Sequence, residues 1–252
     1  MIARALALAP DCAPAFVVNG LLAWKHGRMA EAIANMRRAA DLGAGGHALA
    51  WLAYFCFQVG RTREAREAAE RAASADPLFW LCRFALAVAA LAEADFQQAV
   101  LHMRSAVEAT GGEPLTKMFV APFLLYAGEK QEAIDVYADL ARAGAGWYTE
   151  IGQVIGPMVS GNREAADRAI ASTSFVSFAR GDKEYSWFLA LGFVHLEDYD
   201  AALDWLENAI NLGMCNHRFW SEVDPLLARL RGDPRFIALM DRAREKGRTF
   251  QA

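Results

Sequence analysis

The chain has 252 residues, of which 55 % are hydrophobic and 22 % charged, and its formal net charge is −4. That much apolar surface excludes a disordered chain, because its burial can offset the entropy cost of ordering. No run of about 18 apolar residues is free of charges, and no basic surplus is present to neutralise phosphates, so we expect neither a membrane span nor nucleic-acid binding.

A small-residue marker recurs along the chain with a period of about 34 residues. Units read Gly-x-x-x-x-Ala, except that Ala94 and Glu197 replace the glycine in the third and sixth units. Successive marker alanines lie 33, 34, 34, 33 and 36 residues apart: Ala32, Ala65, Ala99, Ala133, Ala166 and Ala202. A period that constant predicts an array of structural repeats.

Six repeats therefore span residues 13–214, and residues 2–12 read as the second helix of a half repeat before them. In the second unit, residues 61–76 place Arg and Glu side chains four positions apart on one helical face and alanines on the other. No segment alternates with a period of two for long enough to be a strand. A solenoid rarely begins with a bare face, which favours a fragment of a longer chain over a face that pairs with another molecule.

The fifth unit, about residues 147–182, departs most from the pattern. Gly156-Pro157 falls inside its expected first helix, where proline removes a hydrogen bond and kinks or ends the helix. Ser172-Thr173-Ser174 falls where its second helix should finish. We expect a shortened or bent pair, which is either a hinge or a degenerate unit without a role.

The tail, residues 215–252, changes character. Asp224-Pro225 and Asp233-Pro234 each put a capping carboxylate before a proline, and that order is typical of a helix start. Short helices are expected over Pro225–Arg231 and Pro234–Arg244. The apolar stripe of the second, Phe236, Leu239 and Met240, predicts a C-terminal cap over the last exposed face of the array.

Over roughly residues 2–214 the pattern resembles the tetratricopeptide repeat (TPR) family, in which each repeat is a pair of antiparallel helices. The resemblance implies an all-α, right-handed superhelical solenoid that forms a single domain over residues 1–252. The tail phrase Asp-Pro-Leu-Leu-Ala-Arg-Leu-Arg-Gly-Asp-Pro-Arg-Phe resembles the end of repeat regions attached to bacterial nucleotide cyclases, Ser/Thr kinases and winged-helix regulators. It implies a place in a larger bacterial signalling or transcription-regulatory protein.

No constellation for bond chemistry is present in the sequence. The five histidines are scattered over different units, and no glycine-rich stretch has the Lys-Ser/Thr of a phosphate loop. We therefore expect no catalytic residues, no metal site and no cofactor. Four cysteines without paired spacing are too few for a disulfide framework, and no export signal is evident, so a cytoplasmic location is predicted.

The family resemblance implies a concave groove lined by the first helix of each repeat. The groove residues that we expect to contact a partner are Val17, Leu21, Trp24, Tyr54, Phe57, Phe84, Val88 and Met118. Their apolar, aromatic character suits an amphipathic helix or an extended apolar peptide, and equally burial by the protein's own tail or by a second copy. If the assumed register is off by one, these residues are core instead. Lys, Arg and Asn are absent from these positions, which disfavours a carboxylate clamp.

The sequence thus predicts a protein-interaction and regulatory scaffold that binds a protein or peptide without bond chemistry. Two other classes stay open. One is a regulatory domain that senses a small ligand at the centre of the superhelix, and the other is an oligomerisation domain that self-associates.

Overall fold

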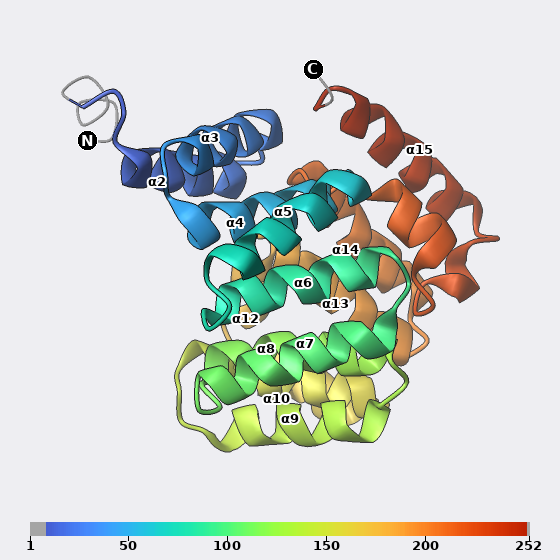
Figure 1. Cartoon of the computed structure of the whole chain (residues 1–252). Coiled ribbons are helices and arrows are strands. Elements are labelled where there is room, and N and C mark those ends of the chain that lie inside the picture. Colours follow the sequence, from blue (N-terminus) through green and yellow to red (C-terminus); the bar gives the residue numbers. More distant parts are fainter. Residues whose placement is uncertain (1–8, 251–252) are drawn as a thin grey trace.

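The fold is that of a computed structural model, which describes residues 9–250. Within this range every regular element is helical, as predicted (Figure 1). The predicted half repeat at 2–12 lies outside the described residues except for its last four positions. None of the helices described over residues 9–250 is long and apolar enough to cross a membrane.

Most of the helices form adjacent pairs joined by tight turns. The pairs are α2 (Ala13–Lys25) with α3 (Met29–Asp41), α4 (Gly45–Gln58) with α5 (Thr62–Ala75), α6 (Trp80–Ala92) with α7 (Phe96–Ala109), α8 (Pro114–Tyr126) with α9 (Lys130–Arg142), α10 (Trp147–Ser160) with α11 (Arg163–Ser172), and α13 (Lys183–His195) with α14 (Tyr199–Asn211). The stacked pairs form an all-α solenoid (Figure 1).

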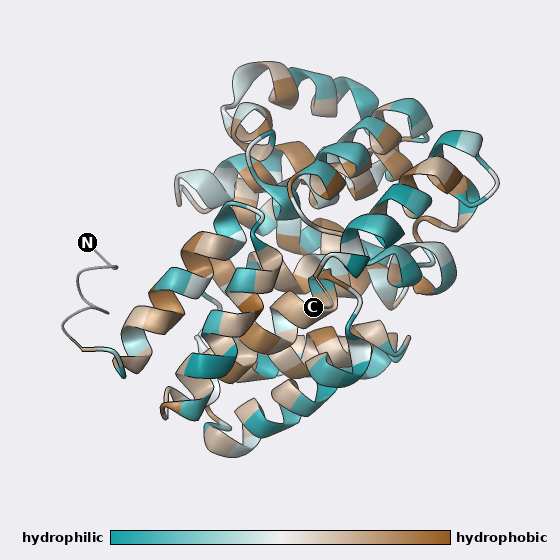
Figure 2. Cartoon of the chain, turned by 90° about the horizontal axis from the view of Figure 1, so that it is seen from above, coloured by the Kyte–Doolittle hydropathy of each residue, from teal (hydrophilic) through white to brown (hydrophobic). Residues whose placement is uncertain are grey.

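The two helices of a pair differ in how they meet water. The second helices are amphipathic: α5 buries four alanines and turns its Arg and Glu side chains outward. The first helices, such as α4 and α6, are apolar nearly all round and largely buried. Figure 2 shows how hydrophobic (brown) and hydrophilic (teal) residues are distributed along the helices. All six marker alanines are fully buried, because a side chain of one carbon lets neighbouring helices approach closely.

The turn inside each pair uses a left-handed backbone residue. Gly60 has a φ of 78° and Gly128 a φ of 82°, a conformation that glycine adopts without steric cost. Ala94 and Glu197, which replace this glycine, keep the same conformation at φ 64° and 57°. Each of the two therefore carries a strain of about 1–2 kcal/mol.

The fifth pair differs from its expected form. α10 does not end at Pro157 but continues to Ser160. Pro157 lies in the last turn, where the backbone hydrogen bonds of the neighbouring residues still hold the helix. The expected shortening falls on α11, whose last residue is Ser172. The extended backbone of Thr173 (ψ 160°) ends this helix, and the short helix α12 (Phe175–Ala179) follows.

The tail contains one of its two expected helices. α15 (Pro234–Arg248) begins at the predicted proline, and its buried stripe packs beside α14. The prediction of a helix over Pro225–Arg231 is wrong, because only a 3₁₀ turn, η2 (Ala228–Leu230), forms there. The buried Asp224 carboxylate accepts hydrogen bonds from the Leu226 and Leu227 amides, which favours a turn over a helix start. A π-helical turn, η1 (Phe219–Val223), precedes it.

The solenoid closes on itself. The chain descends from α2 to α9 and returns through α10 to α14, so that α2 and α14 lie at the same side (Figure 1). The Cys215 amide donates a hydrogen bond to the Gln58 carbonyl at 2.9 Å, and the Asn216 side chain donates to the Phe57 carbonyl at 2.6 Å. Gly27 packs so closely on the last pair that an added Cβ would lie 2.7 Å from the Leu212 carbonyl oxygen.

Candidate functional site

The residues predicted to line the groove are placed on the inner helices, as expected, but they do not line an open groove. Leu21 and Trp24 are partly buried, and the other six are at most 5 % exposed: Val17, Tyr54, Phe57, Phe84, Val88 and Met118. In the closed structure these six are core residues, and a partner can reach them only if the solenoid opens.

Helix α13 and turn η1 of the same chain cover this inner face. The centre of the Phe57 ring lies 6.3 Å from the centre of the Trp187 ring and 5.3 Å from the centre of the Phe219 ring. The Tyr185 hydroxyl lies 3.9 Å from the Met118 sulfur. The apolar inner face is thus already in contact with an apolar helix.

A small cavity remains where α4, α6, α8 and α13 meet. Its volume is about 20 Å³, which is room for about one water molecule. Aromatic side chains dominate the lining, and one carboxyl group is present: Tyr54, Phe57, Phe84, Val88, Leu91, Phe119, Pro122, Phe123, Tyr126, Glu184, Trp187 and Phe188. The Trp187 indole N–H is buried without a protein partner.

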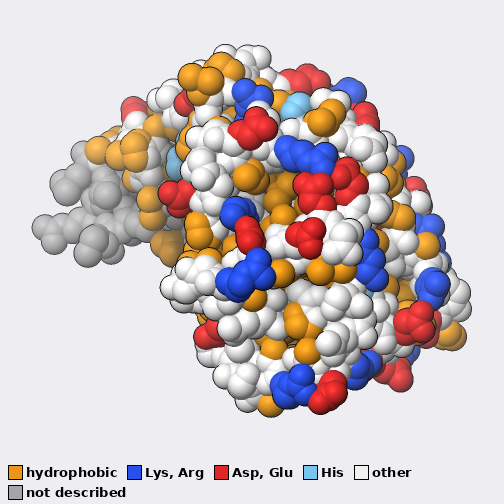
Figure 3. Space-filling view, turned by 90° about the horizontal axis from the view of Figure 1, so that it is seen from below, with side chains coloured by type: hydrophobic (Ala, Val, Ile, Leu, Met, Phe, Trp, Pro, Cys, Tyr) orange, Lys and Arg blue, Asp and Glu red, His pale blue; other side chains and the backbone are white. Residues whose placement is uncertain are grey.

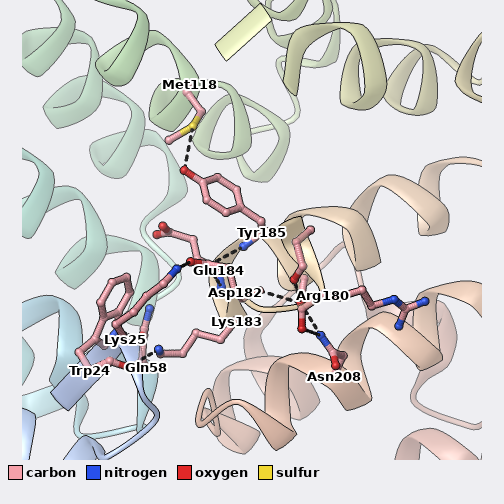
Figure 4. Close-up of polar contacts among 12 residues, drawn as sticks. Trp24, Lys25, Gln58, Met118, Arg180, Asp182, Lys183, Glu184, Tyr185 and Asn208 are labelled. Carbon is pink, nitrogen blue, oxygen red and sulfur yellow. Dashed lines mark hydrogen bonds and ion pairs between the residues drawn. The ribbon is translucent and has the colours of Figure 1, made fainter. Parts of the chain in front are cut away.

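Three consecutive charged residues at the start of α13 join it to the first two helix pairs (Figure 4). The Asp182 carboxylate accepts from the Lys25 ammonium at 2.5 Å. The Lys183 ammonium donates to the Trp24 carbonyl and lies 4.2 Å from the centre of the Trp24 ring. The Glu184 carboxyl accepts from the Tyr54 hydroxyl. We call Asp182, Lys183 and Glu184 the closure triad.

The closure triad is buried, and burial perturbs two of its groups. Loss of hydration, followed by the negative charge of Asp182, raises the pKa of the Glu184 carboxyl to about 7. Loss of hydration lowers the pKa of the Lys183 ammonium to about 8, against the opposing effect of Asp182 and Glu184. Burial also raises the pKa of the Tyr54 hydroxyl. The structure therefore disfavours the charged forms of Glu184 and Lys183.

The closure triad was not predicted from the sequence. Its signal was three charged residues in a row before the apolar run Trp187–Val194. Charges at a helix start usually face water, so the pattern alone does not distinguish a buried contact from a solvated cap.

An open groove lies on the outer side of the divergent fifth pair. It has a volume of about 610 Å³ and is lined by α9, α10 and α11. Gly152 forms part of its floor, where α10 approaches the α9 backbone closely. The charged residues in the lining are Arg142 and Arg168, and they are already paired with Asp139 and Glu164. Nothing in this groove indicates a ligand.

Neither sign of charge dominates the face of the molecule that Figure 3 shows. Lys and Arg side chains are interspersed with Asp and Glu on the face in Figure 3. Among residues 9–250, no group of three or more His, Cys, Asp or Glu side chains is placed to hold a metal ion. Val18 and Leu22 on α2 are 47 % and 42 % exposed.

The tetratricopeptide repeat family model matches residues 1–47 and 57–114, which supports a place in that family. No curated protein matches the chain.

The solved structures that are similar to it include the following two. A human IFIT1 dimer with PPP-AAAA is 17 % identical with a TM-score of 0.48, and the match covers 84 % of this chain and 57 % of that one. The TPR domain of P58(IPK) is 11 % identical with a TM-score of 0.32, and the match covers 99 % and 83 %. The chain thus spans little more than half of the IFIT1 chain, and neither likeness extends an activity to it.

Proposed function

We propose that this chain, with its tetratricopeptide repeats, is a protein-interaction scaffold whose inner face binds an apolar helix. The observation that carries the proposal is the position of α13 against the inner face. A helix from the same chain fills that face with Trp187 and Phe188, so its shape and chemistry suit a helical ligand.

The finer parts of the proposal rest on the sequence. The tail phrase over residues 224–236 supports a place in a larger bacterial signalling or regulatory protein, and the cysteine usage supports a cytoplasmic location. Val17, Leu21, Trp24, Tyr54, Phe57, Phe84, Val88 and Met118 stay the proposed partner-contact residues. Their burial means that a partner helix replaces α13 instead of adding to it.

The inner cavity of the closed form does not support ligand sensing at the centre of the solenoid. A cavity of about 20 Å³ admits a water molecule but no metabolite. Light scattering over a concentration series tests self-association. A strict monomer would exclude an oligomerisation domain.

A helical peptide tests the proposal. We would titrate a fluorescent peptide with the sequence of residues 182–196 into the full chain and measure anisotropy. A peptide of the same composition in scrambled order is the control. Saturable binding of the native sequence alone is the expected result, measured both in the wild type and in the Lys25→Met variant. Equal binding of the two peptides, or none by either variant, would contradict a helix-binding inner face.

A further inference from the structure

We infer that the closure triad is a latch that holds α13 in the inner groove and thereby regulates access of a partner helix to it. The inference rests on the proposed function, because the latch has a role in regulation only if the groove binds a partner. The contacts of the closure triad are present in the structure whether or not a partner binds.

The latch is assembled from distant parts of the chain. Lys25 and Asp182 are 157 residues apart in sequence, and Tyr54 and Glu184 are 130 apart. The triad therefore joins the last pair to the first two. Figure 4 shows the side chains of Trp24 and Lys25 pointing toward residues 182–184.

The chemistry of the contact differs from that of the other helix packing. Four charged residues are buried within residues 9–250, namely Asp182, Lys183, Glu184 and Asp224, and three of them form the closure triad. The repeat interfaces are held by alanines and larger apolar side chains. A buried ionic contact adds little net stability over an apolar one but is costly to disturb at a single partner. The charged groups of the closure triad are therefore expected to separate together, because breaking one contact alone leaves a buried charge without its partner.

We place the point of movement of the latch in the chain that precedes α13. Between α11 and α13 the regular pairing is interrupted by the extended Thr173 and the five-residue α12. The Thr173 hydroxyl is buried without a partner. This connector, residues 173–181, is where we place the hinge expected from the divergent fifth unit.

Ionisation of Glu184 acts on the same contact. The groups around it are Lys25 of α2, Tyr54 of α4, and its neighbours Asp182 and Lys183. Lys246 of α15 also acts on Lys183. Since burial disfavours the ionised carboxylate, the closed form is held more tightly when Glu184 is protonated and is weakened as pH rises through about 7.

Two native cysteines report the opening. Cys215 is buried in the closing contact, where its amide bonds to the Gln58 carbonyl. Cys82 is buried near Gly46, between the second and third pairs, and is the matched control. A thiol reagent with peptide-level mass spectrometry gives both rates in the full chain.

The test compares the wild type with Lys25→Met and with Tyr54→Phe, which removes only the hydroxyl. Arg104→Met breaks an outer ion pair with Glu129 and serves as the control variant. We expect Cys215 to react about tenfold faster or more in the two latch variants, with Cys82 unchanged, and the ratio of the two rates to rise with pH. Equal acceleration of both cysteines would mean global unfolding, and unchanged rates would mean no latch; either result overturns the inference. Selective labelling of Cys215 without peptide binding would instead contradict the proposed function alone.

Discussion

The substitution Glu184→Gln isolates the energetic consequence of the buried carboxyl group. A carboxyl whose pKa rises from 4.5 to about 7 on folding is favoured in its protonated form. The stability that protonation supplies is fully present below pH 4.5 and is lost as pH rises through about 7. Glutamine is always neutral and can still accept the Tyr54 hydrogen bond.

The magnitude follows from the size of the pKa change. A rise of the pKa from 4.5 to about 7 lowers the unfolding free energy of the wild type at pH 8 by about 3 kcal/mol. Lys183 loses a favourable charge when Glu184 is replaced, which offsets part of the gain. We therefore expect the variant to be about 1–3 kcal/mol more stable than the wild type at pH 8, and less than about 1 kcal/mol different at pH 4.5.

Urea unfolding at pH 4.5, 6 and 8, followed by tryptophan fluorescence and by circular dichroism, measures this difference. The control is Glu222→Gln, at an exposed residue paired with Arg218, which should change stability by less than about 1 kcal/mol at each pH. A change for Glu184→Gln that is the same at all three pH values, or a loss of stability at pH 8, would refute the reasoning.

Backbone geometry supports two further predictions. Ala94→Gly should raise the unfolding free energy by about 0.5–1 kcal/mol, because it removes the left-handed strain at φ 64° and loses part of that gain to chain entropy; Gly128→Ala should lower it by a similar amount, and opposite signs in thermal unfolding are the check. Gly152→Ala should cost about 1–3 kcal/mol, because its Cβ would lie 2.4 Å from a backbone nitrogen of α9. Gly232→Ala, whose Cβ would meet nothing within 4 Å, should leave the melting temperature unchanged, and equal melting temperatures for these two variants would contradict the close approach of α10 to α9.

The helices were predictable because their signals are local. Each marker alanine and each turn residue is repeated within about 34 positions, and Asp233-Pro234 marks a helix start by its own chemistry. Pro157 shows the limit of a local rule: the position of the residue within its helix decided the outcome, and that position was not evident from the pattern.

The closure was not predictable, because it depends on the curvature that six stacked pairs accumulate. The residues around Trp24 in the sequence do not indicate that the Lys183 ammonium contacts its ring. The aromatic character of these positions is evident from the sequence, but composition alone does not say whether a partner or the chain's own helix covers such a face. Burial of Tyr54 and Phe84 is therefore a result of topology.

Contact between Gly27 and Leu212 limits how many helix pairs can lie between them. Open arrays gain or lose a repeat at little cost, because each unit contacts only its neighbours. Here an inserted pair would move the last unit away from the first by the full width of a repeat. The close contact of α2 with the last pair thus depends on the number of units that lie between them.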